Sequence, residues 1–361
     1  MKIVICSHSR SHLLDVASSL SKLGNDVHFF SYTKRKFVEE KSFPVKNFHS
    51  TLLLAILPML LKSRKLLRNV IDIYISLVLP KSDVYIFQSP HFPRSIKKAR
   101  KKGGYIILDR GSTHVRYFNQ RRLIYSKDTQ NEWYMSFDEA QYDIVDCISV
   151  GSNYVKESFE ECNFDKCPIF VNNYGSTLTY FKPTILNYKY DLIFVGAWSK
   201  RKGCDVLAKF LESHQEISLV HIGNIVDGYV PNTPNFTHIG FVAEKELLTY
   251  YSQSKVFILP SYDEGLALVQ TQAIACGLPL VITKYTGGID LKQYVDKPEY
   301  INVMSDITTE EIERCCNEAL KQASSQIGER SYSHNLDGMS WDAYAKRYIS
   351  FLETALTPIN K

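Results

Sequence analysis

The chain has 361 residues, more than a single domain of ordinary size, which predicts two domains. Hydrophobic residues make up 45% and charged residues 22% of it, a balance that is typical of a folded globular protein and argues against disorder. Up to Ile185 there are 27 Lys and Arg against 17 Asp and Glu, whereas the remainder has 16 and 21. A basic first half favours contact with an anionic surface or a phosphorylated acceptor, although solvated lysines would give the same count.

The eight cysteines form no C-x-x-C pair, and their spacing fits neither a zinc site nor a compact disulfide framework. We therefore expect reduced thiols in a cytoplasmic protein. The apolar run at Met1–Cys6 is too short for a signal peptide and is typical of a buried first strand. No uninterrupted stretch of about 20 apolar residues occurs, so no membrane-spanning helix is expected.

In the first half, strand-like apolar runs alternate with helix-length segments, which predicts a parallel sheet covered by helices. Lys2–Cys6 is the first predicted strand, Ser11–Leu23 has apolar residues at helical spacing, and Asp26–Phe30 is the next strand. Further strands are predicted at Val84–Phe87, Tyr105–Leu108, Ile144–Val150 and Pro168–Val171.

The pattern breaks at the polar stretch Tyr180–Tyr190, after which a second series begins. Its predicted strands are Asp191–Val195, Ile217–Ile222, Phe236–Ile239, Val256–Leu259 and Leu280–Thr283, with helices at Glu244–Ser252 and Leu268–Cys276. The sequence thus predicts an α/β protein with two Rossmann-like, doubly wound domains, at residues 1–183 and 184–339. Residues 340–361 add one amphipathic helix, Trp341–Leu356.

Several nucleotide sites are excluded by the sequence. No G-x-G spacing and no G-x-x-x-x-G-K-[ST] loop occur, so neither the dinucleotide fingerprint nor the P-loop is present. The sequence contains no D-x-D pair, the motif that would hold a divalent cation together with a nucleotide diphosphate. A nucleotide-diphosphate site would therefore need side chains or backbone amides, rather than a metal, to neutralise the phosphates. Neither a metal nor another cofactor is expected, and no nucleic-acid partner.

The most informative segment is Pro260–Pro279, which follows a predicted buried strand. It places Glu264 and Gly265 in a turn and then opens a helix, whose unpaired N–H groups and dipole favour negative charge. Glu264 would lie at the carboxyl edge of the sheet, where doubly wound folds bind ligands. Taken alone, the same residues also fit an ordinary helix start with an acidic cap.

This segment resembles the signature of the family-four retaining glycosyltransferases, of the bacterial glycosyltransferase group 1 type, which have the GT-B fold. The matching residues are Pro260-Ser-Tyr-Asp-Glu-Gly265 and the closing Ala-Ile-Ala-Cys-Gly-Leu-Pro279. The resemblance implies two domains that face each other across a cleft, with Glu264 contacting hydroxyls of the donor sugar. It implies that the backbone of Gly265, Leu266, Ala267 and Leu268 holds the sugar and diphosphate. Gln272 stands where the family has a ribose-binding glutamate. Its side-chain carbonyl oxygen can still accept a hydrogen bond, but it lacks the negative charge that strengthens such a bond to a carboxylate.

Upstream, Phe194–Gly203 looks like the family's strand, glycine and Lys-Gly loop. The resemblance puts Gly196 in the donor site and Lys202 on the donor diphosphate, with Arg201 beside it. These cations would stabilise the charge that develops on the departing nucleotide. Ala197 replaces the arginine that the family has after the glycine.

In the first half, Asp109–Arg116 is similar to a D/E-R-G-S-x-H segment of bacterial members. The resemblance assigns His114 to the C6 hydroxyl of the donor sugar, although a lone histidine is more often structural. Arg110 and Ser112 of this segment, with Ser9 and Arg10 of the first strand-to-helix loop, are candidates for the acceptor or phosphate loop. Two further loops resemble donor-binding segments: the backbone of Phe241 and Val242 would meet the base, and Gly287 would lie near the sugar.

The resemblance implies a retaining, metal-independent transfer of a hexose-type sugar from a nucleotide-diphosphate sugar to a saccharide or lipid-linked acceptor, in bacterial surface polysaccharide or glycan synthesis. The catalytic residues implied are Glu264, His114 and Lys202, in a front-face substitution. Two alternatives remain open: a weak or inactive GT-B partner protein, for which Gln272 and Ala197 argue, and a sugar-nucleotide epimerase or phosphorylase on the same fold.

The apolar run Leu52–Leu61 is followed directly by the basic cluster Lys62–Arg68. This combination favours peripheral attachment to the inner face of an anionic cytoplasmic membrane. A core helix with a solvated basic end fits the same residues.

Overall fold

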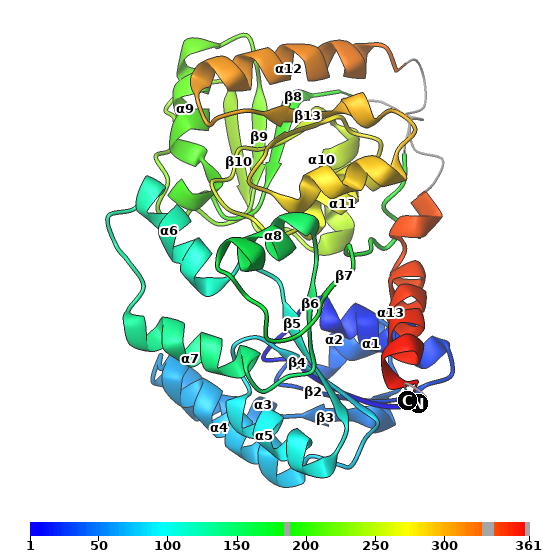
Figure 1. Cartoon of the computed structure of the whole chain (residues 1–361). Helices are drawn as coiled ribbons and strands as arrows, with labels where there is room; N and C mark the ends of the chain where they lie inside the picture. The colour runs from blue at the N-terminus through cyan, green and yellow to red at the C-terminus, as the bar shows by residue number, and fades with distance from the viewer. Residues whose placement is uncertain (184–187, 327–335, 358–361) are drawn as a thin grey trace.

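A computed structural model describes residues 1–183, 188–326 and 336–357 (Figure 1). These residues form two α/β domains, each built on its own parallel sheet. The expected pair of doubly wound domains is therefore present. The predicted boundary between residues 183 and 184 falls at the start of a stretch outside the described residues.

The sheet of the first domain has seven parallel strands in the order β3-β2-β1-β4-β5-β6-β7. Val4, Ile5, Ile86 and Ile107 on its central strands are fully buried, as strands covered by helices on both faces require. The strands are β1 (Lys2–Cys6), β2 (Asp26–Ser31), β3 (Phe48–Ser50), β4 (Val84–Gln88), β5 (Tyr105–Arg110), β6 (Cys147–Val150) and β7 (Ile169–Val171). The helices are α1 (Leu13–Lys22), α2 (Arg35–Glu40), α3 (Leu52–Leu60), α4 (Arg64–Val78), α5 (Pro93–Lys102), α6 (Val115–Tyr125), α7 (Glu132–Tyr142) and α8 (Asn153–Glu161).

The second domain repeats this arrangement with six parallel strands in the order β10-β9-β8-β11-β12-β13. Its strands are β8 (Tyr190–Val195), β9 (Leu219–Ile222), β10 (Phe236–Gly240), β11 (Ser254–Leu259), β12 (Leu280–Thr283) and β13 (Ile301–Met304). Its helices are α9 (Cys204–Ser213), α10 (Leu247–Ser252), α11 (Leu268–Ala275) and α12 (Thr309–Ser324).

After the second domain the chain returns to the first through α13 (Trp341–Leu356). Figure 1 shows this red helix descending beside the first domain, where it packs against α1. Its apolar residues Tyr344, Tyr348 and Leu352 are buried, in keeping with the amphipathic pattern of the sequence.

Some predicted bounds are wrong for local reasons. The strand predicted at Ile144–Val150 begins only at Cys147, because the Asp146 carboxylate accepts hydrogen bonds from the Ile106 amide and Arg100 in the turn before it. The helix predicted at Glu244–Ser252 is divided into a 3-10 turn, Glu244–Glu246, and α10, where the Glu246 carboxylate accepts a hydrogen bond from the Ala243 amide. The short edge strands β3 and β13 were not predicted.

Both sheets reverse their strand order once, between β1 and β4 and between β8 and β11. Ligands of doubly wound folds bind outside the carboxyl ends of the strands at this point. Ser7–His12 follows β1 and Gly196–Lys202 follows β8, while Pro260–Gly265 follows β11. The fold thus brings most of the segments that carry predicted site residues to the two reversal points.

Candidate functional site

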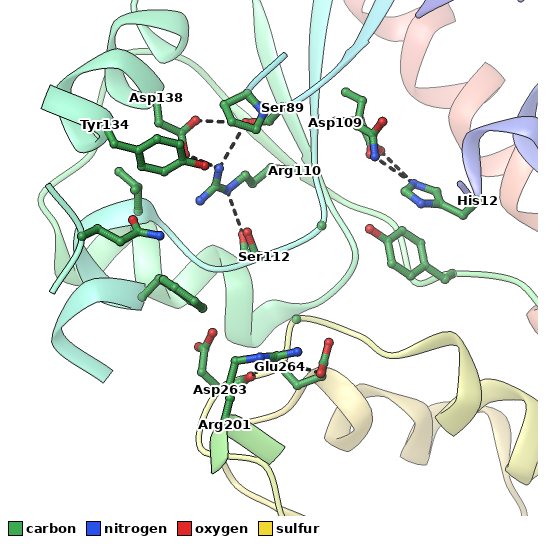
Figure 2. A pocket seen from close by; sticks show the side chains of 18 residues that line it. His12, Ser89, Asp109, Arg110, Ser112, Tyr134, Asp138, Arg201, Asp263 and Glu264 are labelled. Atoms are coloured by element: carbon green, nitrogen blue, oxygen red, sulfur yellow. Dashed lines mark hydrogen bonds and ion pairs between the residues drawn. The ribbon is translucent and has the colours of Figure 1, made fainter. Parts of the chain in front are cut away.

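A pocket of about 510 Å³ lies between the two domains, within the range of small-molecule sites (Figure 2). The carboxyl ends of β1, β4 and β5 and helices α6 and α7 contribute its wall from the first domain, and the loops after β8 and β11 contribute the opposite wall. The residues labelled in the figure are His12, Ser89, Asp109, Arg110, Ser112, Tyr134, Asp138, Arg201, Asp263 and Glu264.

Glu264 is held by two cations on the second-domain wall. Its Oε2 lies 3.0 Å from Lys202 Nζ and 3.1 Å from Arg201 Nη1. Burial alone would raise the pKa of the Glu264 carboxyl, but Lys202 and Arg201 lower it to about 2. The group is therefore an ionised hydrogen-bond acceptor at neutral pH, next to two positive charges.

Two glycines, Gly196 and Gly203, lie on either side of Lys202 in the chain and leave room for its side chain next to Glu264. Gly196 follows β8 with a φ of +136°, and a Cβ on it would lie 3.2 Å from Lys202 Nζ. Gly203 ends the 3-10 turn Lys200–Lys202 with a φ of +72°, and a Cβ there would come within 2.0 Å of the Pro260 carbonyl oxygen. A side chain at either position would disturb the lysine or the start of the Glu264 loop.

The loops of the two domains touch beside the pocket. A Cβ on Gly265 would lie 2.2 Å from the carbonyl oxygen of Gly111, and one on Gly287 would lie 2.4 Å from Cβ of Ser152; both neighbours belong to the first domain. The Ser152 hydroxyl of the first domain donates a hydrogen bond to the Gly265 carbonyl at 3.1 Å. Glycine is thus required where the backbones of the two domains meet.

Asp263 joins the domains through its carboxylate. It accepts hydrogen bonds from the hydroxyls of Thr113 at 3.1 Å and Tyr154 at 2.9 Å, both in the first domain, and only 1% of it is exposed. Burial raises the pKa of Asp263 to about 6, although the hydrogen bond from Tyr154 and the charge of Arg201 act against the rise. Asp263 therefore titrates close to physiological pH.

A histidine and an aspartate pair on the first-domain wall. His12 Nε2 lies 3.1 Å from Oδ1 of Asp109, and the His12 ring packs against Tyr174 with 4.3 Å between centroids. Figure 2 shows this pair on the side of the pocket opposite the Arg110 group. The pair offers a ring nitrogen whose orientation is fixed by a buried carboxylate.

Arg110 lies in a second polar group on the same domain. Its guanidinium donates hydrogen bonds to Asp138, to the Ser89 hydroxyl and to the carbonyl oxygens of Ser112 and Thr113. Burial acts to lower the pKa of Arg110, but Asp138 acts to raise it, and the pKa lies above its ordinary value, so the guanidinium stays ionised. Tyr134 and Gln130 beside it also line the pocket, and the group offers several hydrogen-bonding atoms to a polyhydroxylated molecule.

His114 caps the start of helix α6. Its side chain lies outside the pocket lining, packed against Phe159 at 4.9 Å between centroids and against Tyr142, and its Nδ1 accepts a hydrogen bond from the Arg116 amide at the start of α6. Burial, together with the charge of Arg110, lowers the pKa of His114 to about 4. It is a neutral N-cap in the core, while its neighbours Ser112 and Val115 reach the pocket.

The remaining predicted residues lie around the pocket rather than in its lining. Gln272 is buried in α11, where its Oε1 accepts a hydrogen bond from Tyr251 at 3.3 Å. Arg10 forms an ion pair across the domains with Glu244 at 3.1 Å, and Ser9 offers its carbonyl oxygen to Ser7. Phe241 is 79% exposed. The other predicted donor-loop residues are Val242, Leu266, Ala267, Leu268 and Gly287; Leu266 and Gly287 are buried and the rest half-buried.

Four residues of the pocket were not predicted from the sequence as site residues: His12, Asp138, Tyr174 and Asp263. Asp109 carried a usable signal, because it directly follows the predicted strand Tyr105–Leu108, whereas His12 lies within the predicted helix Ser11–Leu23 and caps α1. Tyr174 carried a similar signal, because it comes shortly after the predicted strand Pro168–Val171, whereas Asp138 lies within helix α7 and follows no strand end. Among the described residues, no group of three or more His, Cys, Asp or Glu side chains is arranged to hold a metal ion.

Comparison with known proteins agrees with this architecture. Residues 179–292 match the family described as glycosyl transferases group 1. An uncharacterized glycosyltransferase of Methanocaldococcus jannaschii is 22% identical over 172 residues, 46% of this chain and 47% of that protein. This chain spans about half or less of the length of the curated relatives that it matches.

Solved structures match over nearly the whole chain. A sucrose-phosphate synthase from Thermosynechococcus elongatus has a TM-score of 0.68 at 15% identity, with 98% of this chain and 99% of that one covered. The Anabaena protein HepE, solved with UDP and glucose, has a TM-score of 0.67 at 12% identity, covering 98% and 100%. At these identities the likeness shows the fold. Residues 179–292 thus carry a glycosyl transferases group 1 domain, set within a chain that has the GT-B fold.

Proposed function

We propose that this protein is a retaining, metal-independent glycosyltransferase that moves a hexose-type sugar from a nucleotide-diphosphate sugar to a saccharide or lipid-linked acceptor. The observation that carries the proposal is the Glu264 carboxylate between Lys202 and Arg201, at the point where the second-domain sheet reverses its strand order. This arrangement puts an acceptor for sugar hydroxyls next to cations for a diphosphate. The Anabaena protein HepE, which was solved in complex with UDP and glucose, supports a donor of this kind.

The proposed reaction is a front-face substitution. The bond between C1 of the sugar and the diphosphate oxygen breaks, and the acceptor oxygen bonds to C1 on the same face. The acceptor's proton passes to the departing diphosphate, whose charge Lys202 and Arg201 stabilise. Glu264 holds the sugar by its hydroxyls, and the polar groups around Arg110 and His12 hold the acceptor. We assign the product to bacterial surface polysaccharide or glycan synthesis.

The test is a screen of UDP-, GDP-, ADP- and dTDP-sugars for hydrolysis and for transfer to simple saccharides, with and without a metal chelator. We expect turnover with one donor class that the chelator does not reduce and that Glu264→Ala abolishes. Lys200→Ala is the matched control for Lys202→Ala, because Lys200 is an exposed cation in the same turn. NMR of the product's anomeric proton decides between retention and inversion.

A second candidate is a partner protein with the GT-B fold and little or no catalytic activity. The specific observation in its favour is that the carbonyl oxygen of Gln272, at the expected ribose position, already accepts a hydrogen bond from Tyr251. This candidate predicts no turnover with any donor. Phosphorolysis, or conversion of the donor to an epimer, in the same screen would instead favour the phosphorylase or epimerase alternatives.

A further inference from the structure

The first domain exposes an unusually large apolar surface on α3 and α4. In α3, Leu53 is 84% exposed, Leu57 62% and Leu60 75%, while only Ala55 and Pro58 are buried. In α4, Leu77 is 77% exposed. We call this surface the α3–α4 face; its exposed members are Leu53, Ile56, Leu57, Met59, Leu60, Leu61, Ile73, Tyr74, Leu77 and Val78.

This exposure argues against one of the two interpretations of Leu52–Leu61, the core helix. A core helix would bury most of its leucines, whereas α3 presents them to the surroundings on several sides. Soluble monomers rarely expose apolar patches of this kind, and such patches mark sites where another apolar phase is contacted. Within the described residues, no helix combines the length and apolar character needed to cross a bilayer.

The charges along the chain in and around α3 and α4 are almost all positive. Between Thr51 and Lys102 the sequence has eleven Lys and Arg but only two Asp and Glu. Lys62, Arg64 and Lys65 are exposed between α3 and the first turn of α4. Asp72, the sole acid of these two helices, is buried and accepts hydrogen bonds from the amides of Arg94 and Ser95. The face therefore presents leucines and cations together without exposed carboxylates.

We propose that the α3–α4 face binds an anionic lipid bilayer, with the leucines of α3 inserted at the interface and Lys62, Arg64 and Lys65 on the lipid phosphates. Apolar insertion beside basic residues is the chemistry by which interfacial helices bind such membranes. A second copy of this chain fits less well, because a two-fold contact would set each cation against another cation with no carboxylate in α3 or α4 to pair with it.

The face also lies next to the pocket through α7. Arg68 of α4 stacks on Phe137 of α7 at 4.1 Å, and Lys65 lies 5.4 Å above the Trp133 ring. Tyr134 and Asp138 of the same helix line the pocket. If the proposed function holds, this arrangement favours a lipid-linked acceptor whose head group enters the pocket between α6 and α7. The membrane contact itself does not depend on the enzymatic activity.

The test is flotation of the full-length protein with vesicles of phosphatidylcholine alone and with added phosphatidylglycerol, across a salt series. We expect binding to the anionic vesicles that weakens as salt rises, and little binding to the neutral ones. A triple Ser variant, with Leu53, Leu57 and Leu60 replaced, should bind anionic vesicles at least tenfold more weakly at low salt. In a triple Gln variant, with Lys62, Arg64 and Lys65 replaced, vesicle binding should no longer depend on salt. Val226→Ser, at an exposed apolar residue of the second domain, is the matched control.

No binding of the intact protein at low salt would overturn the proposal, as would equal binding by the triple Ser variant. Light scattering adds a separate readout: a dimer that the triple Ser variant converts to a monomer would show that a second copy covers the face. The substituted leucines are exposed, so the variants should fold. A thermal unfolding midpoint close to that of the unchanged protein checks this. Donor hydrolysis by the same variants should match that of the unchanged protein, which separates failure of this proposal from failure of the proposed function.

Discussion

The Glu264 carboxylate and the Lys202 ammonium group form an ion pair, so each is the other's counter-charge. Without a ligand the carboxylate compensates both Lys202 and Arg201. A bound diphosphate would offer these cations a second anion, and Glu264 would then be released toward the sugar hydroxyls. We therefore expect the nucleotide diphosphate and the sugar to be recognised together.

Lys202→Ala tests this coupling. A charge-assisted contact is worth roughly 1.5–3 kcal/mol, so we expect the dissociation constant of the nucleotide diphosphate to rise about 10- to 100-fold. Calorimetric titration with UDP, GDP and ADP measures it. Lys200→Ala should bind as the unchanged protein does. Equal affinities of both variants would mean that Lys202 does not meet the diphosphate.

Which site residues could be predicted depended on their spacing along the chain. Glu264 and Lys202 stand in contiguous motifs, so the sequence pointed to them before the fold was known. Asp263 was not recognised, although it precedes Glu264, because its partners Thr113 and Tyr154 come from the other domain. A sequence match does not report which way a side chain turns: the resemblance assigns His114 to the donor sugar, and in the structure its ring caps α6.

At the scale of elements, the short loop after β11 connects chemistry to domain packing. Gly265 follows Glu264 directly and lies against Gly111 of the first domain. The same turn therefore places the carboxylate and sets how closely the domains approach.

Gly265→Ala should separate the domains. Its Cβ would lie 2.2 Å from the Gly111 carbonyl oxygen and 3.2 Å from Val155, and neither backbone can move without opening the cleft. We expect transfer activity to fall at least tenfold and the radius of gyration in solution scattering to increase. The thermal unfolding midpoints of the two domains should change little, since the clash lies between the domains and not within either core. Activity and radius both unchanged would rule out a closed domain contact at this glycine.

Arg347 of helix α13 adds hydrogen bonds to the packing that holds the returning chain on the first domain. Arg347 donates to the Asn172 side chain at 2.7 Å and to the carbonyl oxygens of Gly338 at 2.8 Å and Asn173 at 2.9 Å. Arg347→Ala leaves these acceptors without their donor, so we expect the free energy of unfolding to fall by about 2–4 kcal/mol in urea titrations. Lys346→Ala, at an exposed position beside it, should stay within about 0.5 kcal/mol of the unchanged protein.

The elements themselves were largely predictable, because both domains alternate buried strands with helices. The central strands β1 and β12 and helix α13 have the predicted bounds. The edge strands β3 and β13 were missed, since strands of three and four residues that are only partly buried carry little periodic signal. The exposure of α3 could not be predicted either, because an apolar run looks the same whether its partner is the core or another phase.

At the scale of the whole molecule, a buried carboxylate couples domain contact to pH. Asp263 has a pKa of about 6 in the folded protein, against an ordinary value of 3.8. Since the folded form holds the proton more tightly, this group contributes stability in full below about pH 4. The contribution is lost as the pH rises through about 6, when the buried group must ionise.

Asp263→Asn removes this titration while keeping a side chain of similar shape between Thr113 and Tyr154. We expect the unchanged protein to lose about 2 kcal/mol of stability relative to the variant between about pH 4.5 and pH 7, because each unit of pKa difference is worth about 1.4 kcal/mol. Urea unfolding of both proteins across this range measures the difference, and other titrating groups cancel in it. A difference that stays constant with pH would show that Asp263 is already ionised at pH 4.5, and that its hydrogen bonds from Thr113 and Tyr154 outweigh the cost of burial.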